Sequence, residues 1–157
     1  MSASASPTGP ATASALFLRE PEIRRGVELL LLAQRAMAEA IAPVLAAHDL
    51  GRAHQRALYF IARRPDLAVG DLIALLGITK QSLGRVLTEL EARGLIDSRP
   101  GTTDRRQRLL RLTDAGAELE ADLFAALRER LSAAYIRAGQ GAVGGFWAVL
   151  EGLIAEA

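Results

Sequence analysis

The segment from Ile78 to Arg111 constrains the fold most strongly, because its hydrophobic period changes at Gly94. Before Gly94, apolar residues follow the i, i+3, i+4, i+7 spacing of a helix with one buried face; they are Leu83, Val86, Leu87 and Leu90. After Gly94, two short apolar runs, residues 95–96 and 109–112, flank a polar segment with the turn-forming pair Pro100-Gly101. The sequence therefore predicts a helix that ends at Gly94, followed by a β-hairpin.

The other face of this helix is polar. Its side chains are small, or long enough to donate hydrogen bonds to base edges and phosphates; they are Lys80, Gln81, Ser82, Arg85 and Thr88, with Gly84 among them. We expect Gln81, Ser82 and Arg85 to contact bases. We expect Lys80, Thr88 and, on the hairpin, Arg99 to contact phosphates, which sets the register on a duplex without reading its sequence.

Positive charge is concentrated in the same segment. Residues 78–111 hold eight basic and four acidic side chains, a net charge of +4 in a chain whose total is only +1. A nearly neutral protein with one basic stripe has the electrostatic footprint of a polyanion binder. The alternative is that these arginines only keep an exposed hairpin solvated.

Two shorter helices precede the polar helix. The pattern predicts one over residues 52–63, with Ala57, Leu58 and Ile61 in the core, and one over residues 70–76 that Gly77 closes. Thr79 is then the expected N-cap of the polar helix, and we also place it among the DNA-contacting residues. Two helices separated by about three residues that include a glycine form a helix-turn-helix signature. Residues 49–112 are thus predicted to fold as a winged helix-turn-helix.

Long apolar helices are expected on both sides of this lobe. The first spans residues 20–47, with Pro43 near its end and Gly51 as the expected stop, and two more span residues 114–138 and 142–155. Thr113 is the expected N-cap of the second. Helices this far apart in sequence cover one another only in part, so the simplest arrangement is a two-fold dimer. The dimer would carry two copies of the polar helix, which is the DNA-recognition helix of such a motif, matched to two half-sites about one turn of DNA apart.

Composition excludes several classes of protein. The chain has 157 residues, half of them hydrophobic, and no cysteine, so one mainly helical domain is expected, without disulfides, thiolate chemistry or cysteine-bound zinc. We find no catalytic motif and expect no enzyme activity and no cofactor. No secretory signal and no apolar run near the roughly 18 residues of a membrane span is found. We expect a cytoplasmic protein with a disordered tail over residues 1–15.

The sequence resembles the MarR family of bacterial transcription regulators. The residues that carry the resemblance are LIALLGIT (residues 72–79), SLGRVL (82–87) and RGLI (93–96), then the wing pattern DSR (97–99), DRR (104–106) and LRLTDAG (110–116). The resemblance covers residues 20 to 155 and weakens toward both ends. It implies one domain over residues 16–157, in which residues 16–48 and 113–157 form dimerisation helices.

The resemblance also implies how such a protein works. The family's homodimer is triangular with interlocking terminal helices, its recognition helix enters the major groove, and its wing tip reaches the minor groove. Many members are repressors that leave DNA when a small anionic or phenolic ligand binds between the dimerisation helices and the DNA-binding lobe. The absence of cysteine sets this chain apart from the oxidation-sensing branch.

Individual roles on the wing follow from these expectations. Arg106 is the first candidate for the minor groove and Arg105 the alternate, because an arginine reads a narrow, electronegative groove. Asp104 would orient that arginine by a charge-assisted hydrogen bond, or would form an ordinary surface ion pair. Arg111 either faces DNA or is a strand residue that pairs with an acid in the core of the lobe.

Four further residues each have two alternative roles. His48 and His54 suit solvent-facing or hydrogen-bonded roles better than a metal site, which needs another ligand. Phe146 and Trp147 belong to the dimer core or to a ligand pocket, and we predict no specific ligand-binding residues.

The function predicted from the sequence is a homodimeric, sequence-specific regulator of a palindromic operator in double-stranded DNA. We expect a repressor that a small-molecule effector modulates. Two alternatives use the same basic surface. A non-specific architectural DNA binder would show little dependence on sequence and a steep dependence on salt. A winged-helix interaction module would instead bind an acidic protein.

Overall fold

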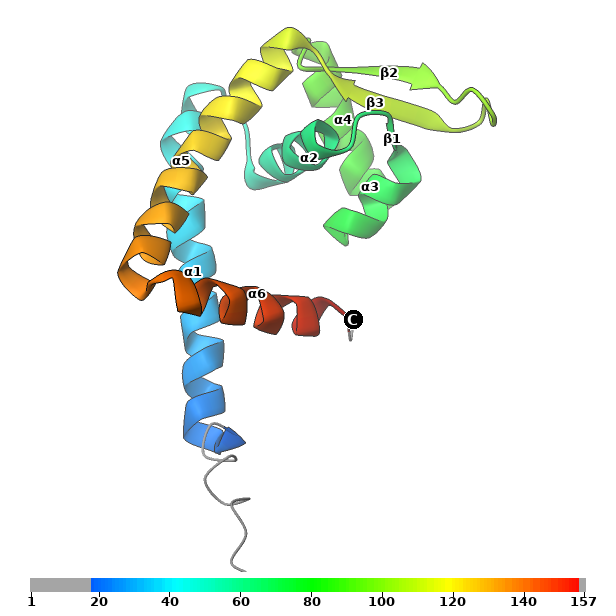
Figure 1. The fold of residues 1–157 in the computed structure, drawn as a ribbon. Coiled ribbons are helices and arrows are strands. Elements are labelled where there is room, and N and C mark those ends of the chain that lie inside the picture. The colour runs from blue at the N-terminus through cyan, green and yellow to red at the C-terminus, as the bar shows by residue number, and fades with distance from the viewer. Residues whose placement is uncertain (1–17, 156–157) are drawn as a thin grey trace, which may run out of the picture. The chain divides into compact units, whose positions relative to one another are not determined.

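The computed structural model describes residues 18–155, which fold into six helices and three strands (Figure 1). In chain order they are α1 (Glu20–Ala47), α2 (Arg52–Arg63), β1 (Leu67–Ala68), α3 (Val69–Leu76), α4 (Lys80–Ala92), β2 (Ile96–Pro100), β3 (Arg108–Leu112), α5 (Asp114–Ala138) and α6 (Gln140–Ala155). All six predicted helices and the predicted hairpin are confirmed. The expected disordered tail lies outside the described residues.

The chain divides into two compact units, residues 1–37 and residues 38–157. The described part of the first unit is chiefly the N-terminal portion of α1. The second unit holds the end of α1 and all later elements, and it contains the hydrophobic core. The largest side chains with less than 2% of their surface exposed are Leu58, Ile61, Leu72, Leu83, Leu87, Leu90, Ile96, Leu110 and Leu123. The buried faces predicted for α2 and α4 are therefore confirmed.

The helix α1 ends where predicted, but the residue that stops it is not the expected Gly51. The helix ends at Ala47, and Asp49 takes the left-handed conformation expected of a glycine, with φ 50°. The Leu50 N–H donates to the Leu45 carbonyl at 3.0 Å and the Asp49 N–H to the Ala46 carbonyl at 3.2 Å, which is the Schellman pattern. An aspartate tolerates this conformation better than most residues. Gly51 is consequently not the stop of α1 but the N-cap of α2.

The caps of α4 and α5 follow the sequence closely. Thr79 accepts a hydrogen bond from the Ser82 N–H at 3.1 Å, and Gly94 closes α4 with φ 67° and a bond from the Leu95 N–H to the Leu90 carbonyl at 2.9 Å. Thr113 caps α5 by accepting from the Gly116 N–H at 3.0 Å. These caps satisfy backbone groups that a helix end leaves without partners.

The wing belongs to a three-stranded antiparallel sheet in the order β1-β3-β2. The predicted hairpin pairs Ile96 with Leu112 at its base and Pro100 with Arg108 near its tip, and it extends away from α2, α3 and α4 (Figure 1). Strand β1, which pairs Leu67 with Leu110, was not predicted. Two residues are too short a run to show a strand period, so only the neighbouring β3 reveals this strand.

Gly116 allows the start of α5 to pack on the base of the wing. A Cβ atom at this position would lie 1.9 Å from the Leu95 carbonyl oxygen. The close approach is held by Thr113, whose hydroxyl donates to the Gly94 carbonyl at 2.6 Å and whose N–H donates to the Leu95 carbonyl at 3.1 Å. The T-x-x-G run therefore joins the end of α4, the start of β2 and the start of α5.

The apolar stripes of the outer helices are exposed. In the first unit, Ile23, Val27 and Leu31 on α1 are each at least half exposed. In the second unit, no residue of α6 is buried, and Trp147 and Ile154 are 53% and 74% exposed. Contrary to the sequence-based expectation, α1 is long and apolar enough to span a membrane by length and composition alone. This is weak evidence, because an apolar helix of a soluble protein passes the same test.

Candidate nucleic-acid interface

The first two turns of α4 present polar side chains that no other described residue holds in place. Lys80, Gln81 and Arg85 are exposed, and within residues 18–155 their side chains make no hydrogen bond or ion pair. The opposite face of α4 is fixed in the core by Leu83, Val86, Leu87 and Leu90. A rigid helix thus carries free donors on its outer face, as a helix that enters the major groove requires.

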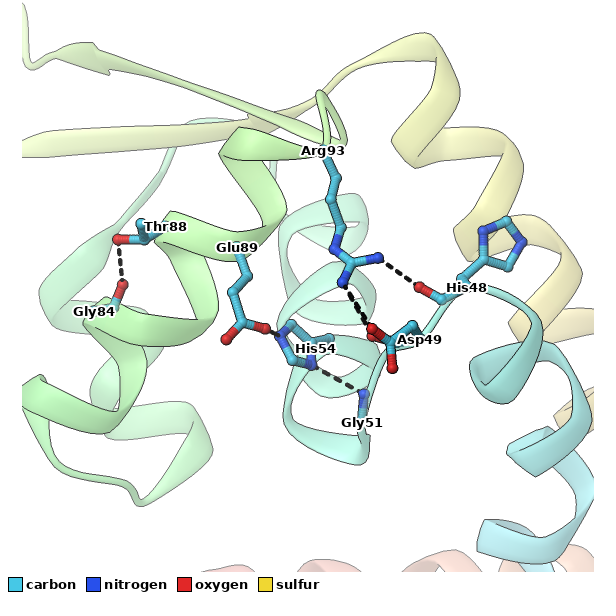
Figure 2. Close-up of polar contacts among 8 residues, drawn as sticks. All are labelled: His48, Asp49, Gly51, His54, Gly84, Thr88, Glu89 and Arg93. Atoms are coloured by element: carbon cyan, nitrogen blue, oxygen red, sulfur yellow. Dashed lines mark hydrogen bonds and ion pairs between the residues drawn. The ribbon is translucent and has the colours of Figure 1, made fainter.

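Two other predicted contact residues of α4 are already engaged. The Thr79 hydroxyl donates to the Ser82 hydroxyl at 2.9 Å, so the O–H of Ser82 remains available as a donor. The Thr88 hydroxyl donates to the Gly84 carbonyl at 2.8 Å within the helix (Figure 2). Thr88 must therefore rotate its hydroxyl before it can donate to a phosphate.

The tip of the wing is shaped by backbone contacts. Asp104 accepts a hydrogen bond from the Arg106 backbone N–H at 2.9 Å, and its carbonyl accepts from the Gln107 N–H at 3.0 Å. Gly101 is buried in this turn, where a Cβ atom would lie 2.5 Å from the Asp104 carbonyl oxygen. The expectation that Asp104 orients an arginine side chain is not what the structure shows. Its carboxylate instead holds the turn that exposes Arg105 and Arg106.

The arginine side chains at the tip are free. Arg105 and Arg106 are exposed, and in the described part of the chain neither guanidinium has a hydrogen-bond or ion-pair partner. Two cations at the end of a projecting hairpin can reach a groove that the body of the protein does not enter.

One aspartate holds two arginines nearer the base of the wing. Asp66 accepts two hydrogen bonds from Arg111, at 2.8 and 2.7 Å, and it pairs with Arg99 at 2.8 Å. The Arg111 hydrogen bond is the main reason that the pKa of Asp66 lies below its usual value, with a smaller contribution from Arg99. Arg111 is thus a strand residue paired with an acid, the second of its two readings. The expected position of that acid in the core is wrong, because the Asp66 side chain is 28% exposed at the surface. The same carboxylate also binds Arg99, which was expected to contact a phosphate.

Two more arginines are paired in ways that the sequence did not reveal. Arg108 donates to the Ser98 hydroxyl at 3.0 Å and forms an ion pair with Glu91. Arg93 donates to the His48 carbonyl at 2.6 Å and lies 3.5 Å from an Asp49 carboxylate oxygen (Figure 2). The strand period could have placed Arg99 and Arg111 on one face of the hairpin. No local pattern could have identified their acidic partners.

The eight basic residues of segment 78–111 therefore fall into two groups. Arg93, Arg99, Arg108 and Arg111 pair with three acids of the lobe, Asp49, Asp66 and Glu91. Lys80, Arg85, Arg105 and Arg106 have no partner within residues 18–155. The free cations lie at the start of α4 and at the tip of the wing, which are the two places where a winged helix meets a duplex.

The histidines lie beside the end of α4. His54 accepts from the Gly51 N–H at 3.0 Å through Nδ1, and its Nε2 lies 2.7 Å from a Glu89 carboxylate oxygen (Figure 2). Between residues 18 and 155, no group of three or more histidine, aspartate or glutamate side chains is arranged to hold a metal ion. His54 is thus a hydrogen-bonded residue of the lobe.

Comparison with known proteins agrees with this architecture. The model of the MarR family matches residues 48–107. The HTH-type transcriptional regulator PetP of Rhodobacter capsulatus is 47% identical over 145 residues, which cover 92% of this chain and 87% of PetP.

Two solved structures share the fold at low sequence identity. NadR in complex with 4-hydroxyphenylacetate has a TM-score of 0.69 at 22% identity and covers 99% of this chain and 96% of its own. The MepR–DNA complex of S. aureus has a TM-score of 0.65 at 18% identity, over 83% of this chain and 97% of its own. With the close relationship to PetP over nearly the whole chain, the winged helix-turn-helix places this protein in the MarR family of transcriptional regulators.

Proposed function

We propose that this regulator reads a specific duplex sequence with the start of α4 in the major groove and the tip of the wing in the minor groove. The observation that carries the proposal is the division of the basic residues. Among the eight basic residues of segment 78–111, only the cations at these two places have no partner in the described part of the chain, because acids of the lobe pair with the other four. A non-specific binder has no need for such a selective arrangement.

The proposed roles follow from which atoms remain available. Gln81 and Arg85 have free side chains at the outer face of α4 and Ser82 has a free O–H, so these three contact base edges. Lys80 contacts a phosphate, and Thr88 and Arg99 do so after leaving their present partners. Thr79 positions the first turn of the helix as its cap. Arg106, with Arg105 as the alternate, enters the minor groove, and Asp104 holds the turn that exposes them.

We infer a homodimer in which the exposed apolar faces of α1 and α6 are covered by a second copy. Exposed apolar area of this extent calls for a partner, and a two-fold dimer matches an inverted repeat. The domain division follows: residues 49–112 form the DNA-binding lobe, and residues 16–48 and 113–157 form the dimerisation helices. The dimer works as a cytoplasmic repressor, without a catalytic step or a cofactor.

A small-molecule effector belongs to the same proposal. NadR, which shares the fold, is described in complex with 4-hydroxyphenylacetate. We propose that this chain also responds to a small ligand.

Selection of binders from a random duplex pool tests the proposal. The purified protein should enrich an inverted repeat with half-site centres about 10 bp apart. Binding that falls steeply with salt and enriches no sequence would favour the architectural alternative. No retained DNA at moderate salt would point to an acidic protein partner and contradict the proposal.

A further inference from the structure

The C-terminal half of α4 is tied to the joint between α1 and α2 by two side chains one helical turn apart. Glu89 contacts His54 near the start of α2, and Arg93 contacts His48 and Asp49 beyond the end of α1 (Figure 2). All of these residues lie in the second unit. They form what we call the polar bracket, which consists of His48, Asp49, Gly51, His54, Glu89 and Arg93.

Arg93 supplies a cation that the end of α1 lacks. The last turn of α1 contains no basic residue, although carbonyl groups at a helix C-terminus favour a positive charge. Arg93 donates to the His48 carbonyl at 2.6 Å and to the Asp49 carbonyl at 3.2 Å. The Asp49 carboxylate is 99% exposed, so its ion pair with Arg93 is screened by water. The bonds to the two carbonyls therefore determine where Arg93 lies.

Glu89 and His54 supply groups that the start of α2 lacks. The N-cap of α2 is Gly51, which has no side chain, and the first turn of α2 has no acidic residue. The Gly51 N–H donates to His54 Nδ1, so the proton of the imidazole is on Nε2 and points to Glu89 at 2.7 Å. The His54 side chain is only 13% exposed, which restricts its orientation. Glu89 thus places a negative charge beside a helix N-terminus that has none of its own.

We propose that the polar bracket sets the angle of α4 against the α1–α2 joint and thereby the spacing of DNA half-sites that the dimer accepts. This inference rests on the proposed dimeric recognition of an operator. The two contacts lie on the same side of α4 and meet opposite ends of the joint, so they resist rotation of the helix about its contact with the core. Glu89 and Arg93 are positioning residues that act through the base-contacting residues of the first turns.

The test uses full-length protein and a series of operators. The inverted repeat found by selection is rebuilt with its spacer shortened or lengthened by one base pair, and affinity is measured for each duplex. Arg93→Lys keeps the positive charge but cannot donate to both carbonyls in the fork geometry of a guanidinium. His54→Asn keeps an acceptor for the Gly51 N–H and removes the bond to Glu89. Glu118→Gln is the matched control, because it removes the charge of an exposed carboxylate on α5 that lies outside the polar bracket.

The wild type and Glu118→Gln should prefer one spacing sharply. In Arg93→Lys and His54→Asn, the ratio of affinities between the best and the neighbouring spacing should fall about threefold to tenfold. Unchanged ratios in both variants would overturn the inference, since a merely stabilising role moves the unfolding midpoint and not the preferred spacing. A variant that unfolds is replaced by Glu89→Ala, which removes an exposed group from the same contact. A wild type that binds no inverted repeat would instead contradict the dimeric operator function itself.

Discussion

The two halves of α4 carry similar residues and use them differently. In the first half, Lys80 and Arg85 have no partner within residues 18–155, and the same holds for Arg105 and Arg106 at the wing tip. In the second half, Glu89 and Arg93 are bound to the α1–α2 joint, and at the base of the wing Asp66 holds Arg99 and Arg111. Within segment 78–111, an arginine is free for DNA where no acid of the described residues pairs with its guanidinium group. The paired half supports the free half by fixing its orientation.

The largest effect is expected where the wing meets α5. Gly116→Ala places a Cβ atom 1.9 Å from the Leu95 carbonyl oxygen, and only backbone movement could relieve the clash. We expect a loss of about 3 kcal/mol or more in the free energy of unfolding, measured by urea denaturation. The change would disturb both the free and the paired basic residues, because this contact joins the end of α4 to the base of the wing. Gly70→Ala is the control, since no atom lies within 4 Å of the added carbon. Equal stability of the two variants would contradict the packing described here.

Removal of a free arginine should reduce DNA affinity without loss of stability. We expect Arg106→Ala to weaken operator binding by about 1–3 kcal/mol at physiological salt, while thermal unfolding of the protein stays unchanged. Arg105→Ala, measured beside it by fluorescence anisotropy, tells which of the two enters the groove. Operator affinity equal to that of the wild type in both variants would remove the wing tip from the interface.

Asp66→Asn should convert two paired arginines into free ones. The variant releases Arg99 and Arg111, so non-specific DNA binding should become stronger and its dependence on salt steeper, by about 0.9 in the slope of log K for each added phosphate contact. Operator selectivity should fall as a result. Titrations at several salt concentrations measure this, and an unchanged slope would mean that these arginines contact DNA even when paired.

The same residue should contribute to stability in a pH-dependent way. The pKa of Asp66 is lowered from 3.8, chiefly by the hydrogen bond from Arg111. The ionised carboxylate therefore stabilises the fold above pH 3.8, and this contribution is lost as the pH falls through the lower pKa of the folded state. The difference in unfolding midpoint between the wild type and Asp66→Asn should be present at neutral pH and disappear in acid. A difference that persists in acid would assign the stabilisation to another cause.

Glu120 should have the smallest effect on stability, and the dependence of this effect on pH should be opposite to that of Asp66. Burial raises its pKa, and the charge of Arg63 only partly offsets this. The folded state binds the proton more tightly, so stability falls as the pH rises from 4.5 through the raised pKa. Glu120→Gln should raise stability at neutral pH by at most about 0.5 kcal/mol, because solvent screens a partly buried group. Calorimetry at neutral and acid pH would show whether the gain vanishes in acid.

Much of the fold could be predicted from local patterns. The bounds of α1, α2 and α5 match those expected from the sequence, and Thr79 and Thr113 cap the helices that follow them. Helical period, capping and turn formation involve residues at most a few positions apart. Two local features, the strand β1 and the stop of α1, were predicted wrongly because the usual sequence signal for each is absent. A two-residue strand shows no period, and the left-handed position that ends α1 is occupied by Asp49 where a glycine was expected.

The sequence by itself determined the family, the winged helix-turn-helix and the set of basic residues that could contact DNA. Only the tertiary structure decided which of them are free. The acids that pair with Arg93 and Arg111 lie 44 and 45 residues away along the chain. An ion pair depends on the distance between two charges in space, and that distance is set only when the helices and the sheet have packed around their common core.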